Sequence, residues 1–141
     1  MTSFSDLYVR YAPDVFRFAL YLSGDWHEAE DITSETFVRA WSATVPIRTA
    51  TVKGYLLTIA RNLFLQGLPR KARHSALDDQ LRDPRESTEA RTELNSELQA
   101  VLVGLQRLSE GDRAALVMRV VDELPYEEIA RALRIADIGP V

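Results

Sequence analysis

The chain has 141 residues, 46% hydrophobic and 27% charged, which is the composition of an ordinary globular protein of one domain or two small ones. The absence of cysteine excludes disulfides, thiolate metal sites and a cysteine nucleophile, and the net charge of −4 gives no overall argument for binding nucleic acid. No apolar stretch is long enough to span a membrane, and the amino terminus has no signal-like run, so we expect a cytoplasmic protein.

The first third of the chain is predicted to be helical. Apolar residues recur at three-and-four spacing over residues 4–22, and Pro13 within them predicts either two helices or one that bends there. Gly24 is a natural helix stop, and Asp25 is a suitable cap for a second helix over residues 25–42.

A basic segment follows. Residues 43–51 are predicted to form a loop, and a helix begins near Val52 and ends at Gly67 and Pro69. Residues 45–75 contain six basic and no acidic residues, which favours a surface facing a polyanion, although a solvated face or pairing with the acidic flanks would give the same pattern. These residues are Arg48, Lys53, Arg61, Arg70, Lys71 and Arg73.

The last part of the chain is again helical. Residues 75–93 lack apolar periodicity and are predicted to be a linker. Helical spacing returns over residues 94–108, and further helices are expected over 110–122 and 126–133. Because residues 94–141 offer few core residues, we expect this part to be poorly stable alone, or to pack against the first part, another copy or an inhibitor.

Catalytic and metal chemistry have little support. His27 and Glu28 resemble half of a zinc-binding helix motif, but Asp31 stands where a second histidine is needed, and His74 is the only other histidine. No glycine-rich phosphate loop or nucleophile motif is present. We therefore expect neither an enzyme nor a bound cofactor or metal.

Three signals remain. Asp31 and Glu35 lie one turn apart on an acidic helix, which suits docking of a basic partner. Tyr55 and Asn62 stand among cations, which suits contact with unpaired bases, although Tyr55 could equally be a core aromatic. Residues 124–135 resemble the first helix of a helix-turn-helix.

Together these segments resemble the extracytoplasmic-function group of bacterial RNA polymerase sigma factors. LYVRYAPDVFRFALYLSGDWHEAEDITSETFVRAW resembles region 2, VKGYLLTIARNLFLQGLPRKAR is similar to the promoter-melting helix with its basic end, and LQRLSEGDRAALVMRVVDELPYEEIARAL resembles region 4. The resemblance implies an all-α fold of two small helical domains, region 2 over 1–74 and region 4 over 94–141, joined by a flexible linker over 75–93.

The resemblance also implies functional residues and partners. Contacts with the β′ clamp of core RNA polymerase would fall on Asp31, Ile32, Ser34 and Glu35. Recognition of a flipped promoter base would fall on the loop at 44–52 and the next helix, through Lys53, Tyr55, Arg61 and Asn62. The other DNA-binding residues would be Arg48, Arg70, Lys71 and Arg73, the last three by holding phosphates. An anti-sigma factor would be a further partner.

The resemblance is weakest at the carboxyl end. After Ile135 the family has a turn and a recognition helix, whereas here six residues follow, so we expect most of the recognition helix of region 4 to be absent. The leading hypothesis is a sigma factor that recognises and melts promoter DNA. The alternative is a truncated sigma-like protein that sequesters core polymerase or an anti-sigma factor; a stand-alone helix-turn-helix regulator would need the recognition helix.

Overall fold

The computed structural model describes residues 3–42, 51–81 and 96–138, and side chains for 3–42, 51–67 and 96–134. These residues form six α-helices and no strand, which confirms the all-α fold. The helices are α1 (Phe4–Ser23), α2 (Trp26–Ser42), α3 (Val52–Leu81), α5 (Ser96–Gln106), α6 (Glu110–Val120) and α7 (Tyr126–Ile138). None of these helices is long and apolar enough to cross a membrane.

The first helix is unbroken. It begins at a capping box, in which the Ser3 hydroxyl accepts a hydrogen bond from the Asp6 N–H and the Asp6 carboxylate accepts one from the Ser3 N–H. It runs through Pro13, so of the two expectations for this segment the single helix is correct. It ends at Gly24, whose φ of 70° lies in the left-handed region that glycine adopts without strain.

The third helix is longer than predicted. The expected end at Gly67 and Pro69 is wrong, because α3 continues to Leu81 and takes in residues 75–81 of the predicted linker. Most residues between 70 and 81 have a high helix propensity, and this preference outweighs the two breakers. The rest of that linker, together with the loop over 43–50 and Arg48, lies outside the described residues.

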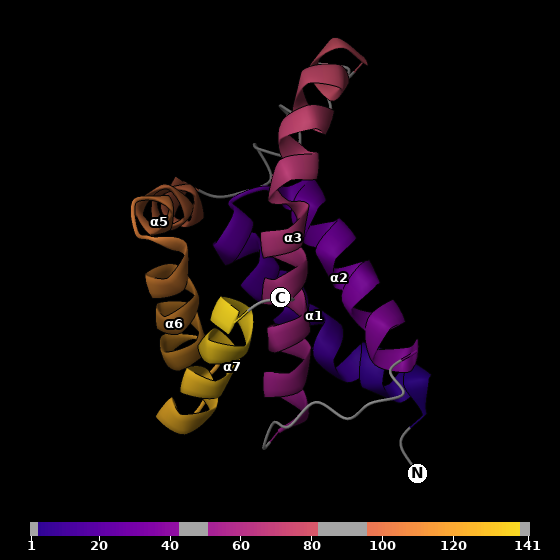
Figure 1. Ribbon diagram of the computed structural model, residues 1–141, viewed down its shortest axis with the longest axis vertical. Helices are drawn as coiled ribbons and strands as arrows, with labels where there is room; N and C mark the ends of the chain where they lie inside the picture. The colour runs from indigo at the N-terminus through magenta and orange to yellow at the C-terminus, as the bar shows by residue number, and fades with distance from the viewer. Residues whose placement is uncertain (1–2, 43–50, 82–95, 139–141) are drawn as a thin grey trace.

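The last three helices fold back onto the first three. Figure 1 shows α7 beside α3 and α5 above α6, with α2 on the other side of α3. The α1 helix contacts α2 and α3, and it also contacts α5 and α6. The α7 helix, predicted to end at residue 133, extends to Ile138, so residues 135–138 lengthen this helix and do not open a new one. The turn before it holds Glu123 at a φ of 57°, a conformation that is uncommon outside glycine.

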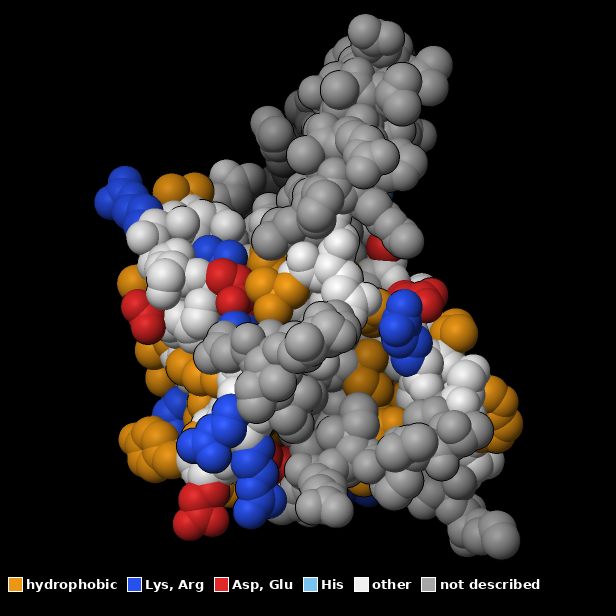
Figure 2. Space-filling model, viewed as in Figure 1, with side chains coloured by type: hydrophobic (Ala, Val, Ile, Leu, Met, Phe, Trp, Pro, Cys, Tyr) orange, Lys and Arg blue, Asp and Glu red, His pale blue; other side chains and the backbone are white. Residues whose placement is uncertain are grey.

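A single hydrophobic core joins the two parts. Phe18 of α1, Leu56 of α3 and Met118 of α6 are fully or almost fully buried in one cluster. Of the outcomes predicted for residues 94–141, the structure therefore has packing against the first part. Hydrophobic side chains also reach the surface on both flanks of the view in Figure 2. Tyr126 of α7 and Trp41 of α2 are among the exposed hydrophobic residues.

Candidate functional site

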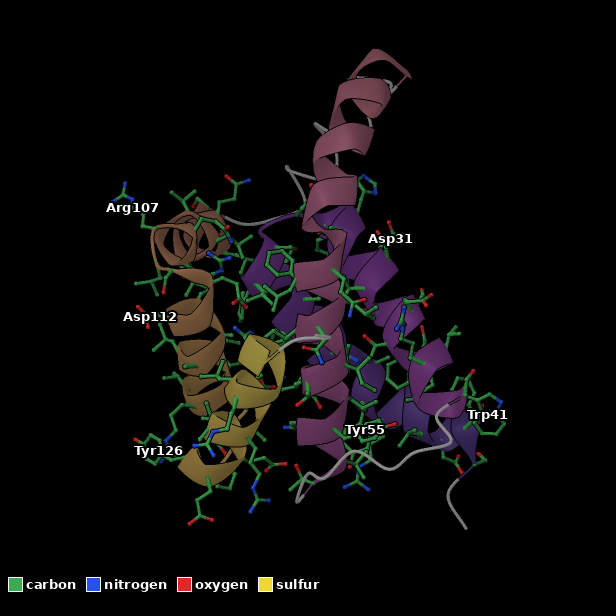
Figure 3. All side chains as sticks on the ribbon, viewed as in Figure 1. Asp31, Trp41, Tyr55, Arg107, Asp112 and Tyr126 are labelled. Atoms are coloured by element: carbon green, nitrogen blue, oxygen red, sulfur yellow. The ribbon has the colours of Figure 1, made fainter. Side chains whose placement is uncertain are left out.

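The acidic face of α2 is positioned by its start. Asp25 caps the helix, since its carboxylate oxygen Oδ1 accepts a hydrogen bond of 2.9 Å from the Glu28 N–H. Asp31, Ser34 and Glu35 follow on the exposed side, and Figure 3 shows Asp31 on the outer edge of α2, away from α6 and α7. Glu35 receives a 3.3 Å hydrogen bond from Arg39, but both side chains are half exposed, so this ion pair is weak and leaves the face available.

A shallow depression lies between this face and α3. Its volume is about 510 Å³. The residues that line it are Asp31, Ser34, Glu35, Val38, Arg39, Leu63, Gln66 and Gly67. Its lining combines the acidic Asp31 and Glu35 with apolar side chains, and such a surface can receive a partner helix that carries basic side chains.

Ile32 lies elsewhere than its three predicted companions. Its side chain is only 6% exposed and belongs to the hydrophobic core, which also buries Phe37 of the same helix. Any influence of Ile32 on a partner in this arrangement is therefore through the position of α2 and not through contact.

The amino end of α3 is closed by a residue from α7. Thr51 caps the helix, because its hydroxyl accepts a 3.0 Å hydrogen bond from the Gly54 N–H. The Glu128 carboxylate then accepts hydrogen bonds from the Thr51 N–H at 3.0 Å and from the Thr51 hydroxyl at 2.7 Å. A carboxylate at this end also interacts favourably with the helix dipole.

Arg61, a predicted DNA contact in the middle of α3, is 2% exposed. Its Nε and Nη2 atoms donate to the two carboxylate oxygens of Glu110 on α6, at 2.6 and 2.5 Å, in the forked geometry that makes arginine–carboxylate pairs strong. A third nitrogen donates to the Leu133 carbonyl oxygen of α7 at 3.4 Å. In this arrangement Arg61 faces two helices and no solvent.

The remaining predicted DNA contacts are less enclosed. Lys53, Tyr55 and Asn62 are half-buried on α3, and Tyr55 packs against the core, as the alternative interpretation of this residue required. Arg70, Lys71 and Arg73 lie on the same helix, beyond the last residue of α3 whose side chain is described.

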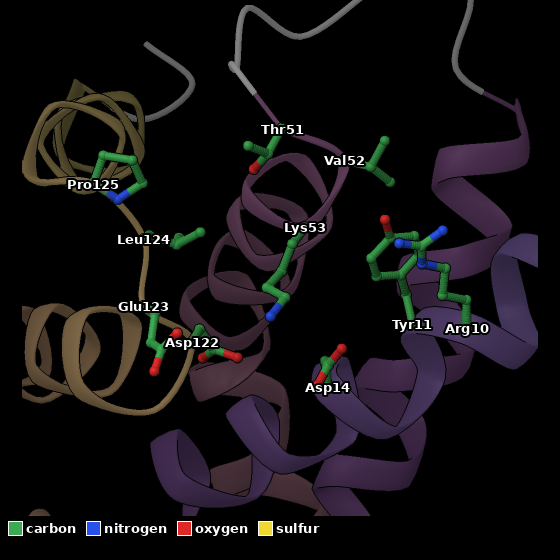
Figure 4. A pocket seen from close by; sticks show the side chains of 10 residues that line it. All are labelled: Arg10, Tyr11, Asp14, Thr51, Val52, Lys53, Asp122, Glu123, Leu124 and Pro125. Atoms are coloured by element: carbon green, nitrogen blue, oxygen red, sulfur yellow. The ribbon is translucent and has the colours of Figure 1, made fainter.

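A polar pocket opens beside Lys53. Side chains of α1, the start of α3 and the turn between α6 and α7 line it, among them Asp14, Lys53 and Asp122 (Figure 4). The Asp122 carboxyl is buried, and neither of its oxygens has a hydrogen-bond partner among the described residues. Burial raises the pKa of Asp122 to about 6, although Lys53 and Arg17 act in the opposite direction. The described residues contain no group of three or more histidine or acidic side chains that could hold a metal ion.

The chain matches two family models in succession. Residues 7–74 match Sigma-70 region 2, and residues 98–137 match Sigma-70, region 4. The ECF RNA polymerase sigma factor SigL of Mycobacterium tuberculosis is 33% identical over 138 residues, which cover 93% of this chain and 76% of SigL. The chain belongs to the extracytoplasmic-function (ECF) family of RNA polymerase sigma factors.

Other ECF relatives differ in length. SigE of Mycolicibacterium smegmatis is 35% identical over 94% of this sigma factor but only 54% of SigE, so the chain spans about half the length of that relative. SigM of Bacillus subtilis is 29% identical, and the match covers 94% of this chain and 82% of SigM. A solved structure of the sigma factor RpoE with the anti-sigma factor NepR from Bartonella quintana has the same fold, with a TM-score of 0.71 over 98% of this chain and 88% of RpoE, at 22% identity.

Region 2 of the sigma factor thus contains α1, α2 and most of α3, and region 4 contains α5 to α7. The polar residues that join the two regions were missed by sequence analysis. Glu110 and Glu128 bind partners 49 and 77 positions away, so neither helical spacing nor a local motif signals them. The only clue was that residues 94–141 had too small a core of their own.

Proposed function

We propose that the chain initiates transcription by joining core RNA polymerase to promoter DNA, as the family name of its relatives indicates. The observation that carries the proposal is the succession of region 2 and region 4 in one chain whose α2 carries an exposed acidic face. The function consists of binding, and we assign no catalytic step to the chain. We place its action in the cytoplasm, where RNA polymerase works.

We assign docking on the β′ clamp of core polymerase to Asp31, Ser34 and Glu35, with Ile32 in a positioning role. The exposed carboxylates and the depression beside them support this assignment. Attraction between these carboxylates and basic side chains of the partner steers association and fixes the orientation of the partner.

We assign promoter recognition and melting to the basic segment that begins before α3. Extruding a base costs a few kcal/mol, which contacts in a pocket for the flipped base offset. Lys53, Tyr55 and Asn62 are half-buried on the described part of α3. The cationic side chains of the segment would give an affinity for DNA that falls with salt, because bound counterions are released.

The docking assignment is tested by co-elution of the chain with sigma-free bacterial core RNA polymerase. Reversing two charges with Asp31→Arg and Glu35→Arg is expected to weaken binding at least about tenfold, as is typical for like charges at an interface. A charge-matched control, Glu97→Arg with Glu127→Arg, changes two exposed glutamates on α5 and α7 and is expected to bind like the unmodified chain. Equal loss in both variants would contradict the assignment to α2.

We also propose an anti-sigma factor as a partner. The supporting observation is that the RpoE structure with the same fold was solved in complex with one. If the chain were instead a protein that only sequesters polymerase or an anti-sigma factor, it would bind core polymerase without supporting synthesis of promoter-dependent RNA. Run-off transcription with core polymerase, on a template that carries the DNA upstream of the gene for this chain, separates these two functions.

A further inference from the structure

The polar pocket beside Lys53 has the size of a small-molecule site (Figure 4). Its volume is about 450 Å³, within the range of roughly 300–1,000 Å³ that is usual for ligand pockets. Three elements that are distant in the sequence meet there, namely α1, the start of α3 and the turn between α6 and α7. Neither the docking assignment nor the promoter assignment uses Asp122, the buried carboxyl of this pocket.

The Asp122 carboxyl lacks the hydrogen-bond donors that a buried carboxyl needs. It is 4% exposed, and neither oxygen has a partner among the described residues. Two backbone hydrogen bonds fix the turn that carries it, from the Asp122 N–H to the Val117 carbonyl oxygen at 3.1 Å and from the Leu124 N–H to the Met118 carbonyl oxygen at 2.9 Å. Figure 4 shows the carboxyl pointing across the pocket toward Lys53. A ligand that donates to this carboxylate would remove the cost of leaving it unpaired.

Two cations of the pocket are also free to bind a ligand. Neither Lys53 nor Arg10 forms a salt bridge with another of the residues that the structure describes. Arg10 lies over the ring of Tyr11, with its guanidinium carbon 5.4 Å from the ring centre. Asp14, in contrast, is already paired with Arg17. The charges left to a ligand are therefore one buried carboxylate and two cations.

An apolar wall completes the pocket. Leu124 and Pro125 of the turn and Val52 at the start of α3 line it. A simple amine would meet repulsion from the two cations, and a simple anion would meet repulsion from the carboxylates. The ligand that suits all these groups has an ammonium group, a carboxylate next to it and an apolar part.

We propose that this pocket binds a free α-amino acid with an apolar side chain. Its ammonium group donates to Asp122, its carboxylate accepts from Lys53 and Arg10, and its side chain packs on Leu124 and Val52. The long, flexible Lys53 side chain turns its own ammonium group toward the carboxylate of the ligand. The inference goes beyond the proposed function and does not depend on it, because the site needs only the folded chain.

The test measures binding of L-leucine to the full chain by isothermal titration calorimetry at neutral pH. Isocaproate is leucine without the ammonium group, and isoamylamine is leucine without the carboxylate. Each should bind at least about tenfold more weakly than leucine, because hydrogen bonds to charged groups are strong when they are buried. Glycine, which keeps both charges and lacks the side chain, should also bind about tenfold more weakly.

Two variants locate the site. Asp122→Asn keeps the size of the side chain and removes a buried unpaired charge, so the chain should stay folded while leucine binds about tenfold more weakly. Lys53→Met should weaken binding of leucine without weakening binding of isoamylamine. The control Asp112→Asn makes the same chemical change at an exposed position of α6 outside the pocket, and it should bind leucine like the unmodified chain.

Three results would overturn the inference: no saturable binding of leucine, equal binding of leucine and isocaproate, or leucine binding that Asp122→Asn leaves unchanged. Equal binding of glycine and leucine would overturn the role of the apolar wall. None of these results bears on the docking of core polymerase, which the co-elution experiment tests separately. Because the ligand binds only the folded chain, leucine should also raise the temperature of unfolding of the unmodified chain more than that of Asp122→Asn.

Discussion

Asp122 is a costly residue in the contact between the two regions. Its carboxyl is buried in the turn between α6 and α7, and neither oxygen has a hydrogen-bond partner among the described residues. Lys53 and Arg17 attract its negative charge, Asp14 repels it, and burial outweighs all three, so the pKa rises from 3.8 to about 6. Folding thus opposes ionisation of this group, and its protonated form fits the packed state better.

We predict that Asp122→Asn stabilises the chain at neutral pH. A carboxyl whose folded pKa lies above its unfolded value costs stability above the folded pKa, and this cost disappears as the pH falls toward the unfolded value. The variant should gain about 2 kcal/mol at pH 7.5 and show no gain near pH 4. Urea unfolding of both chains across this range measures the difference; the exposed Asp31→Asn is the control, and a gain that did not depend on pH would refute the argument.

Single residues also show the limit of prediction from sequence. Helical spacing correctly placed Asp31 and Glu35 together on an exposed face, because both positions depend only on the local helix. The same reasoning could not show that Arg61 is enclosed, since its partner Glu110 is distant in the sequence and reaches it only after the whole chain has folded. An arginine in a basic segment looks exposed until the partner is known.

At the scale of elements, one glycine ends a helix and another lies inside one, and the sequence alone did not distinguish the two cases. Gly24 ends α1 with a φ of 70°, as predicted. Gly67 was predicted to end α3, yet the helix continues through it, and φ at Gly67 is not positive. A glycine near a proline often ends a helix, but the helix propensity of the surrounding residues decides whether the helix ends there or continues.

Three alanine substitutions test this difference. Gly67→Ala should stabilise the chain by about 0.5–1 kcal/mol, because a Cβ there meets no atom within 4 Å and glycine is a poor helix residue. Gly104→Ala, inside α5 with the same open space, is the matched control and should give the same gain. Gly24→Ala should destabilise by about 1–2 kcal/mol, because alanine is strained at positive φ. Thermal unfolding followed by circular dichroism measures all three, and a loss for Gly67→Ala would mean that α3 ends there.

At the scale of the molecule, the two family regions share one hydrophobic core. Leu102, Val117 and Met118 of region 4 are buried in the same cluster as Val15 and Phe18 of region 2. The sequence predicted that region 4 could not bury enough apolar surface alone. It did not predict which surface would cover region 4, because the hydrophobic effect is non-directional and an apolar face can pack against many partners. We therefore expect the free chain to unfold as one cooperative unit.

Met118→Ala tests this cooperativity. Both tryptophans of the chain, Trp26 and Trp41, lie in α2, so tryptophan fluorescence reports region 2 alone. Removing the fully buried Met118 side chain from α6 should cost about 2–5 kcal/mol. If the core is shared, that cost lowers the urea midpoint of the tryptophan signal and of the circular dichroism signal together. Leu116→Ala, on the same helix but 44% exposed, should leave both midpoints nearly unchanged. If the tryptophan midpoint stayed in place while part of the helical signal was lost at a lower urea concentration, regions 2 and 4 would be separate folding units. The packing of region 4 on region 2 would then be too weak to hold the two regions together.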